Sequence, residues 1–401
     1  MSLSRAADNR LGALVALLLL AVNILSVASQ LGFLHKAKQV KEYDHWRYIE
    51  MARGPEGQAK LQREPPYCFR LAVPALARGL MRAGLSENAS FYLITNAALF
   101  GFLLLLWLHL RDLGFSLPLR VTGLVVTGFT QGAVRWFEYQ YWMSDPAALC
   151  LVMLAFFLIE RESRRVLAAV SVAAAFVRET YVLVYPYVFL HELRLGRRIG
   201  PALARTAAVA ALPLAVLVAI RRLVTPNQPD AFAPGIVDSM GFRIDHLLDN
   251  QLYVVTIGAF GVLLPLVLLF PARLATLARR HFDRALYVAS VYATLAISNN
   301  NERPLAYALP ALVPASLWCP RAFLEETRLA PVPVCAFVVL LQALFWTGQR
   351  FAEIGMSIYQ PVNWITVAAM TSAWLVAQVL LRAARPATAQ KPRITSKSEG
   401  R

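Results

Sequence analysis

The 401-residue sequence is poor in charge, and above all in acidic residues. Charged side chains make up 16% of it, and 24 Asp and Glu stand against 40 Lys and Arg. Apolar residues make up 58%, and they gather in long uninterrupted runs that a water-soluble domain of this length does not have. Several runs are long enough to cross a hydrocarbon core of about 30 Å as a helix. The composition therefore excludes an ordinary soluble fold.

Cysteine and histidine are also scarce. Cys68, Cys150, Cys319 and Cys335 show no paired spacing of the metal-binding kind, and three of them lie in apolar runs. We predict that they are inert packing residues. The histidines are scattered without ligand spacing, so the sequence gives no indication of a zinc site.

The formal net charge of +16 raises the question of a nucleic-acid partner. Most of the arginines, however, stand between apolar runs, and cytoplasmic loops of membrane proteins carry an excess of Lys and Arg. The charge therefore indicates orientation in a membrane. We predict contact with membrane lipids and no nucleic-acid partner.

The apolar runs predict an all-α polytopic membrane protein with about 12 membrane segments and both termini in the cytoplasm. The segments are 10–34, 90–110, 118–134, 144–160, 166–178, 180–193, 202–222, 251–271, 285–298, 304–320, 330–348 and 362–382. The two short segments within 166–193 are interpreted as a hairpin, because this places every arginine cluster on one side; one single span is the alternative. Residues 1–384 form the membrane domain, and the polar tail 385–401 is predicted to be disordered in the cytoplasm.

Three segments fall on the opposite side of the membrane. The first, about 35–89, is long and carries apolar residues at helical spacing, which predicts helices lying at the membrane interface. The second spans 135–145 and mixes acids with aromatic residues, and the third spans 223–250 and is rich in Pro, Asn and Asp. We expect the chemistry of the protein at these segments.

Four short patterns in and around these segments follow one another along the chain. They are Tyr43-Asp44 with Tyr48 and Ala52, Asp145-Pro146 with Ala148 and Leu149, Arg178-Glu179-Thr180 before an apolar run and a proline, and Glu302-Arg303 before PLAYALPALVP. In this order, over about residues 10–320, the chain resembles the GT-C superfamily of integral membrane glycosyltransferases. It departs from the family pattern at Pro304, where an aromatic residue is common, and in having one acid rather than a pair in the first loop.

The resemblance implies transfer of a sugar from a polyprenyl-phosphate donor to a lipid, a lipid-linked glycan or a protein at the periplasmic face of a bacterial inner membrane. Asp44 would act as the base, because a carboxylate within hydrogen-bond reach can take the proton of an acceptor hydroxyl. Arg178, Arg303 and Arg70 would bind the donor phosphate and stabilise the charge that develops on it.

The resemblance also implies contact with the acceptor or with a metal ion for Glu138, Asp145 and Glu179. It gives Tyr43, Arg47 and Tyr48 a supporting role in the first loop. The use of a divalent cation, Mg²⁺ or Mn²⁺, is left open, since the acidic pair is absent.

Simpler interpretations stay open for the same side chains. Asp44 could pair with Lys41 or Arg47, Asp145 could be a helix N-cap, and neighbouring ion pairs could occupy Arg178 and Glu179. For the whole chain, the alternative is a multi-pass transporter or lipid flippase, which would bury polar residues in discontinuous helices at mid-membrane. The ionisable residues gather instead at the ends of the predicted spans, which favours the transferase.

Overall fold

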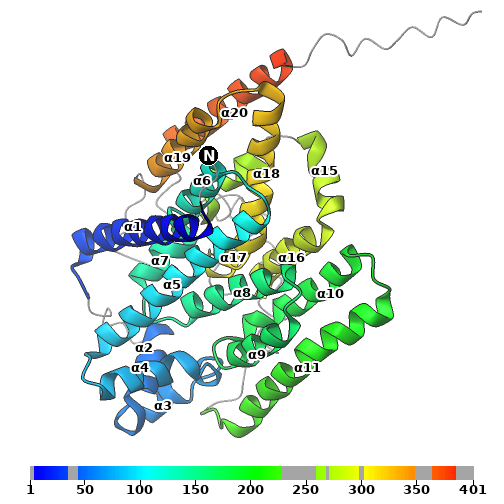
Figure 1. The fold of residues 1–401 in the computed structure, drawn as a ribbon. Coiled ribbons are helices and arrows are strands. Elements are labelled where there is room, and N and C mark those ends of the chain that lie inside the picture. Colours follow the sequence, from blue (N-terminus) through cyan, green and yellow to red (C-terminus); the bar gives the residue numbers. More distant parts are fainter. Residues whose placement is uncertain are drawn as a thin grey trace, which may run out of the picture.

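The structure, a computed structural model, describes residues 4–34, 44–227, 259–267, 271–297, 302–347 and 364–384. Every regular element in these residues is helical, as the sequence predicts (Figure 1). The predicted tail 385–401 and most of the third loop lie outside the described residues.

Three helices among the described residues are long and apolar enough to cross a membrane: α1 (Arg5–Leu31), α5 (Glu87–Asp112) and α11 (Ile199–Leu223). Two of them begin at a serine, Ser4 or Ser86, whose hydroxyl accepts a hydrogen bond from the backbone N–H three residues later. Their length and composition mark a membrane protein.

The remaining helices follow the other predicted segments and their flanks. They are α6 (Leu117–Gly128), α7 (Trp136–Tyr139), α8 (Asp145–Glu160), α9 (Arg164–Ala175), α10 (Val184–Arg194), α14 (Leu263–Val267), α15 (Pro271–Arg280), α16 (Phe282–Ala293), α17 (Glu302–Ala306), α18 (Leu309–Thr327), α19 (Pro331–Thr347) and α20 (Trp364–Ala384). A large cluster of buried apolar side chains joins most of them, with Phe156 of α8 stacked on Tyr187 of α10 at 4.0 Å between ring centres.

The predicted segment 118–134 is not one continuous helix. The helix α6 ends at Gly128, and one π-helical turn (Gln131–Arg135) leads into α7. Side chains of neighbouring helices donate hydrogen bonds to the carbonyl groups at the break. Nδ2 of Asn23 donates to the carbonyl oxygen of Gly128, and Nε2 of Gln342 donates to that of Phe129. The interruption thus has a tertiary cause, which hydropathy along the chain does not show.

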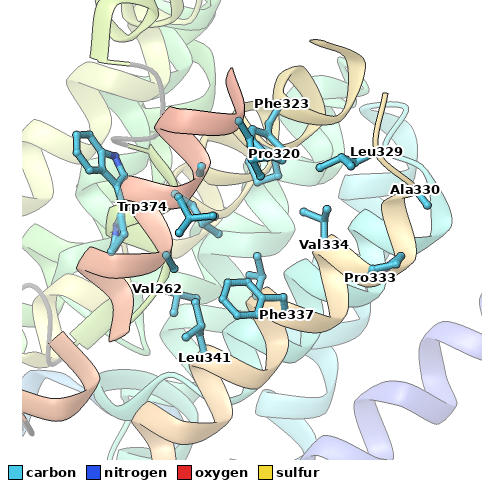
Figure 2. Close-up of a pocket in the computed structure, with 17 residues that line it drawn as sticks. Val262, Pro320, Phe323, Leu329, Ala330, Pro333, Val334, Phe337, Leu341 and Trp374 are labelled. Atoms are coloured by element: carbon cyan, nitrogen blue, oxygen red, sulfur yellow. The ribbon is translucent and has the colours of Figure 1, made fainter. Parts of the chain in front are cut away.

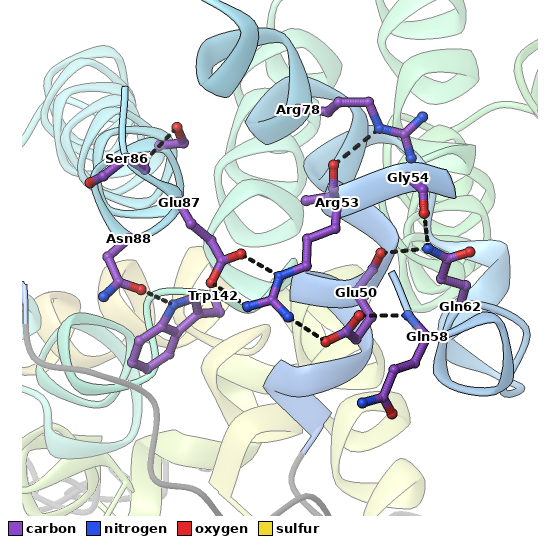
Figure 3. A network of polar contacts seen from close by, with 12 residues as sticks. Glu50, Arg53, Gly54, Gln58, Gln62, Arg78, Ser86, Glu87, Asn88 and Trp142 are labelled. Atoms are coloured by element: carbon purple, nitrogen blue, oxygen red, sulfur yellow. Dashed lines mark hydrogen bonds and ion pairs between the residues drawn. The ribbon is translucent and has the colours of Figure 1, made fainter. Parts of the chain in front are cut away.

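The first long loop contains the helices α2 (Asp44–Arg53), α3 (Ala59–Gln62) and α4 (Ala72–Arg82), with short 3₁₀ turns at Gly54–Glu56 and Tyr67–Phe69. They lie together at the lower left in Figure 1. Glu50 organises this region, since its carboxylate accepts hydrogen bonds from the backbone N–H of Gln58 and from Arg53 at 2.7 Å each (Figure 3). Arg53 also reaches Glu87 and so ties the loop to the start of α5.

Residues 164–194 turn back on themselves. Arg164 at the start of α9 pairs with Glu192 near the end of α10 at 3.4 Å, and the hydroxyls of Ser171 and Tyr181 are 3.2 Å apart. The turn lies at residues 176–178, where the carbonyl of Phe176 accepts a hydrogen bond from the N–H of Ala72. The tip of this hairpin is therefore attached to the first loop.

Candidate functional site

The tip of the hairpin meets the beginning of α8. Nη1 of Arg178 donates to Oδ2 of Asp145, the first residue of α8. Both side chains are buried, and Pro146 occupies the first turn of the helix, where its missing N–H costs no hydrogen bond. The N-cap position belongs to Ser144, so the interpretation of Asp145 as a helix N-cap is wrong, whereas Arg178 is the ion-paired residue that the simpler interpretation expects.

The next residue of the tip reaches the first loop. Glu179 accepts from Nε of Arg70 at 3.0 Å and from Nη2 of the same guanidinium, an arrangement that fixes both partners in one plane. Burial works against the ionised form of Glu179, but the Arg70 guanidinium holds the pKa of this carboxyl at about 2. Arg70 has a third partner, the hydroxyl oxygen of Tyr48 at 2.8 Å.

Tyr48 and Tyr67 link Arg70 to Asp44. The Tyr48 hydroxyl lies 3.2 Å from Oγ of Ser144, and its ring meets that of Tyr67 edge-on at 5.9 Å between centres. The Tyr67 hydroxyl donates to Oδ1 of Asp44 at 2.6 Å. Burial and the adjacent charge of Asp44 raise the pKa of the Tyr67 phenol, so Tyr67 keeps its proton and remains a donor.

Asp44 is the first residue of α2 and is partly accessible, in contrast to the buried Asp145. A carboxylate at this end of a helix is favoured by the helix dipole. Arg47, one turn later, forms an ion pair with Glu64 at 2.5 Å and lies over the ring of Tyr67 at 5.0 Å.

These contacts define one group of side chains, which we call the tip cluster. It consists of Asp44, Tyr48, Tyr67, Arg70, Asp145, Arg178 and Glu179. Arg47 lies at its edge. The structure thus brings together most of the site residues that the sequence nominated, and the bonded pair Arg70 and Glu179 is 109 positions apart in the sequence.

Besides Arg47 at its edge, three nominated residues are not part of the tip cluster. Tyr43 and the side chain of Arg303 lie outside the described residues. Glu138 lies in α7, is buried, and forms no hydrogen bond to any member of the tip cluster.

Sequence reasoning missed one member of the cluster, Tyr67, and two residues beside it, Ser144 and Tyr307. Tyr307, between α17 and α18, lies close enough to Arg178 for the two groups to influence each other electrostatically. Only Tyr67 carried a usable signal, because it lies in the stretch PPYCFR, between two prolines and Arg70.

No family model, no curated protein and no solved structure matches the chain. The functional proposal therefore depends on the geometry above and on the sequence motifs.

The described residues do not fit a divalent cation. No three His, Cys, Asp or Glu side chains in them converge as ligands. In the tip cluster, Asp145 and Glu179 are already neutralised by arginine. We therefore derive no step through a metal ion.

An apolar groove of about 440 Å³ lies between α14, α18, α19 and α20 (Figure 2). Pro320, Phe323, Val334, Phe337 and Trp374 are among its lining residues. Pro320 lies about 16 Å along α18 from Leu309, the end of the helix nearest to the tip cluster, at 1.5 Å per residue. The groove is therefore separate from the tip cluster.

Proposed function

We propose that the protein is an integral membrane glycosyltransferase of the GT-C type. It transfers a sugar from a polyprenyl-phosphate donor to a hydroxyl of a lipid, glycan or protein acceptor, at the periplasmic face of a bacterial inner membrane. The observation that carries the proposal is the tip cluster itself, in which the first-loop acid and two arginines nominated for the donor phosphate lie close together.

The proposed topology has about 12 membrane segments, with both termini and the arginine-rich turns in the cytoplasm. It is supported by the positions of charged residues at the two ends of α8 and of the hairpin. Arg161 and Arg164 lie at the end of these elements that is opposite to Asp145 and Arg178, and α8 is about 24 Å long at 1.5 Å per residue. Other helices cover the short arms of the hairpin. A segment that enters the membrane without crossing it needs such a cover, because lipid cannot satisfy its backbone polar groups.

In the proposed reaction, the acceptor hydroxyl attacks the anomeric carbon of the donor sugar. Its proton passes to the carboxylate of Asp44, the bond from that carbon to the phosphate oxygen breaks, and the electron pair stays on the phosphate. Tyr67 holds Asp44 through one oxygen at 2.6 Å, which positions the carboxylate while the other oxygen takes the proton.

Arg178 and Arg70 would stabilise the phosphate that departs. Each guanidinium has five N–H groups. Nε of Arg178 is buried and has no hydrogen-bond partner among the described residues, so it is a donor that a phosphate oxygen could use. Asp145 and Glu179 keep both arginines in place before the donor binds, which lowers the reorganisation needed during the reaction.

The test is transfer of labelled sugar from polyprenyl-phosphate donors in membranes that contain the protein. Asp44→Asn should lower the rate by about two orders of magnitude or more, the usual effect of removing a positioned base. Glu56→Gln is the matched control, because Glu56 is an exposed acid of the same loop. Equal activity in Asp44→Asn and wild type would refute the assignment of Asp44, and no transfer from any donor would refute the transferase proposal.

One observation favours the transporter alternative. The chain is interrupted between α6 and α8, and it buries Glu138 there without a partner. Interrupted helices with buried ionisable groups are typical of transporters. Uptake or lipid-translocation activity that survives Asp44→Asn would support this second candidate.

A further inference from the structure

Glu138 is a buried acid whose surroundings, in the residues that the structure describes, offer its ionised state one amide, that of Asn96, and no cation. Its relative exposure is 1%, and within the described part of the chain no side-chain or backbone donor lies at full hydrogen-bonding geometry to either carboxylate oxygen. Glu138 lies in α7, the four-residue helix between the π-helical turn and α8. The tip cluster does not use it.

Glu50 is an acid of nearly equal burial that does have donors around it. Its relative exposure is 2%, yet its oxygens accept hydrogen bonds from the N–H of Gln58 and from the guanidinium of Arg53 (Figure 3). The two glutamates therefore differ in their partners and hardly in their burial.

The elements packed against α7 bring no cation to Glu138. On α5, its neighbours are Tyr92 and Asn96, whose Nδ2 donates to the carbonyl of Tyr92 and whose Oδ1 is buried without a partner. On α1, the amide of Asn23 is bonded to backbone carbonyls. Arg135, three residues before Glu138, donates from Nη1 to the carbonyl of Trp346 on α19.

The site therefore contains three buried acceptor atoms, namely both oxygens of Glu138 and Oδ1 of Asn96, and no cation among the described residues to balance a charged carboxylate. An ionised carboxylate buried without a partner costs several kcal/mol. One proton removes this imbalance, because a neutral carboxyl group carries an O–H that can donate to the amide oxygen. Mg²⁺ or Ca²⁺ would need about six oxygen ligands.

We propose that Glu138 is a proton-binding site: its carboxyl group holds a proton in this conformation, and the O–H donates to Oδ1 of Asn96. The interruption after Gly128 creates the site, because it releases α7 from α6 and turns Glu138 toward α5. The inference does not depend on the proposed transferase activity.

The test is infrared difference spectroscopy of the full chain in lipid nanodiscs at neutral pH, where exposed acids are ionised. Wild type should show the C=O stretching band of a protonated carboxyl group, and Glu138→Gln should lack it. Glu50→Gln is the matched control, because it removes an equally buried acid that has donors. Burial raises the pKa of Glu138 to about 8, so the band should disappear on titration through this pH.

A second variant examines the partner. Asn96→Leu should shift the frequency of the band without removing it, because the O–H loses its acceptor while the carboxyl stays buried. Absence of the band in wild type, or its persistence in Glu138→Gln, would overturn the proposal. A band that Asn96→Leu leaves unmoved would overturn the assignment of Asn96 as the acceptor.

Discussion

The ion pair between Arg178 and Asp145 gives the sharpest stability prediction. Arg178→Met keeps most of the length of the side chain and removes the charge, so Asp145 is left ionised in the protein interior. The Asp145 side chain is 0% exposed and that of Arg178 is 8% exposed. Breaking such a buried pair from one side typically costs about 3–5 kcal/mol, and we expect a loss of this size.

A surface pair in the same chain supplies the comparison. Arg321 and Glu325 lie one helical turn apart in α18, with side chains 46% and 66% exposed. Exposed pairs of this spacing contribute about 0.3–0.5 kcal/mol, so Arg321→Met should hardly change the stability. The difference between the two arginine variants isolates the effect of burial.

The assay is reversible unfolding of the purified chain in mixed micelles, with the free energy of unfolding measured for both single variants. A third protein, Arg178→Met with Asp145→Asn, closes a double-mutant cycle. Because the second change removes the stranded charge, the double variant should recover about 1–3 kcal/mol. An Arg178→Met loss no larger than that of Arg321→Met, or no recovery in the double variant, would refute the view that Arg178 neutralises Asp145.

Three further outcomes can be measured directly. Tyr67→Phe should lower the proposed transfer activity by about tenfold while keeping the fold, since it removes one hydrogen bond of about 1.4 kcal/mol to Asp44; unchanged activity would contradict a positioning role. Glu50→Gln should speed proteolysis of the first loop, because it weakens the charge-assisted bond from the N–H of Gln58, and an unchanged cleavage rate would argue against this contact. The stability of wild type should fall as pH rises from about 4.5 to about 8, since the unfolded Glu138 ionises first, and Glu138→Gln should lack this slope; parallel pH profiles would count against a protonated Glu138.

Local sequence was a good guide to the helices and to part of the site. Runs of apolar residues sufficed to place α1, α5 and α11, because a helix satisfies its own backbone in lipid. The sequence motifs also nominated Asp44 and Arg178, which both lie in the tip cluster. The break after Gly128 was not predictable. The side chains that donate to the carbonyl groups there belong to Asn23 and Gln342, which lie 105 and 213 positions from their acceptors.

The sequence by itself determined that the chain is helical and embedded in a membrane, since hydropathy and the period of a helix are properties of neighbouring residues. It also nominated the acids and arginines. Only the tertiary structure decided which of these meet. Asp145 and Glu179 form ion pairs with arginines, whereas Glu138 is buried without an arginine partner among the described residues. The reason is that the partners of a side chain depend on how distant segments pack and not on the residues beside it.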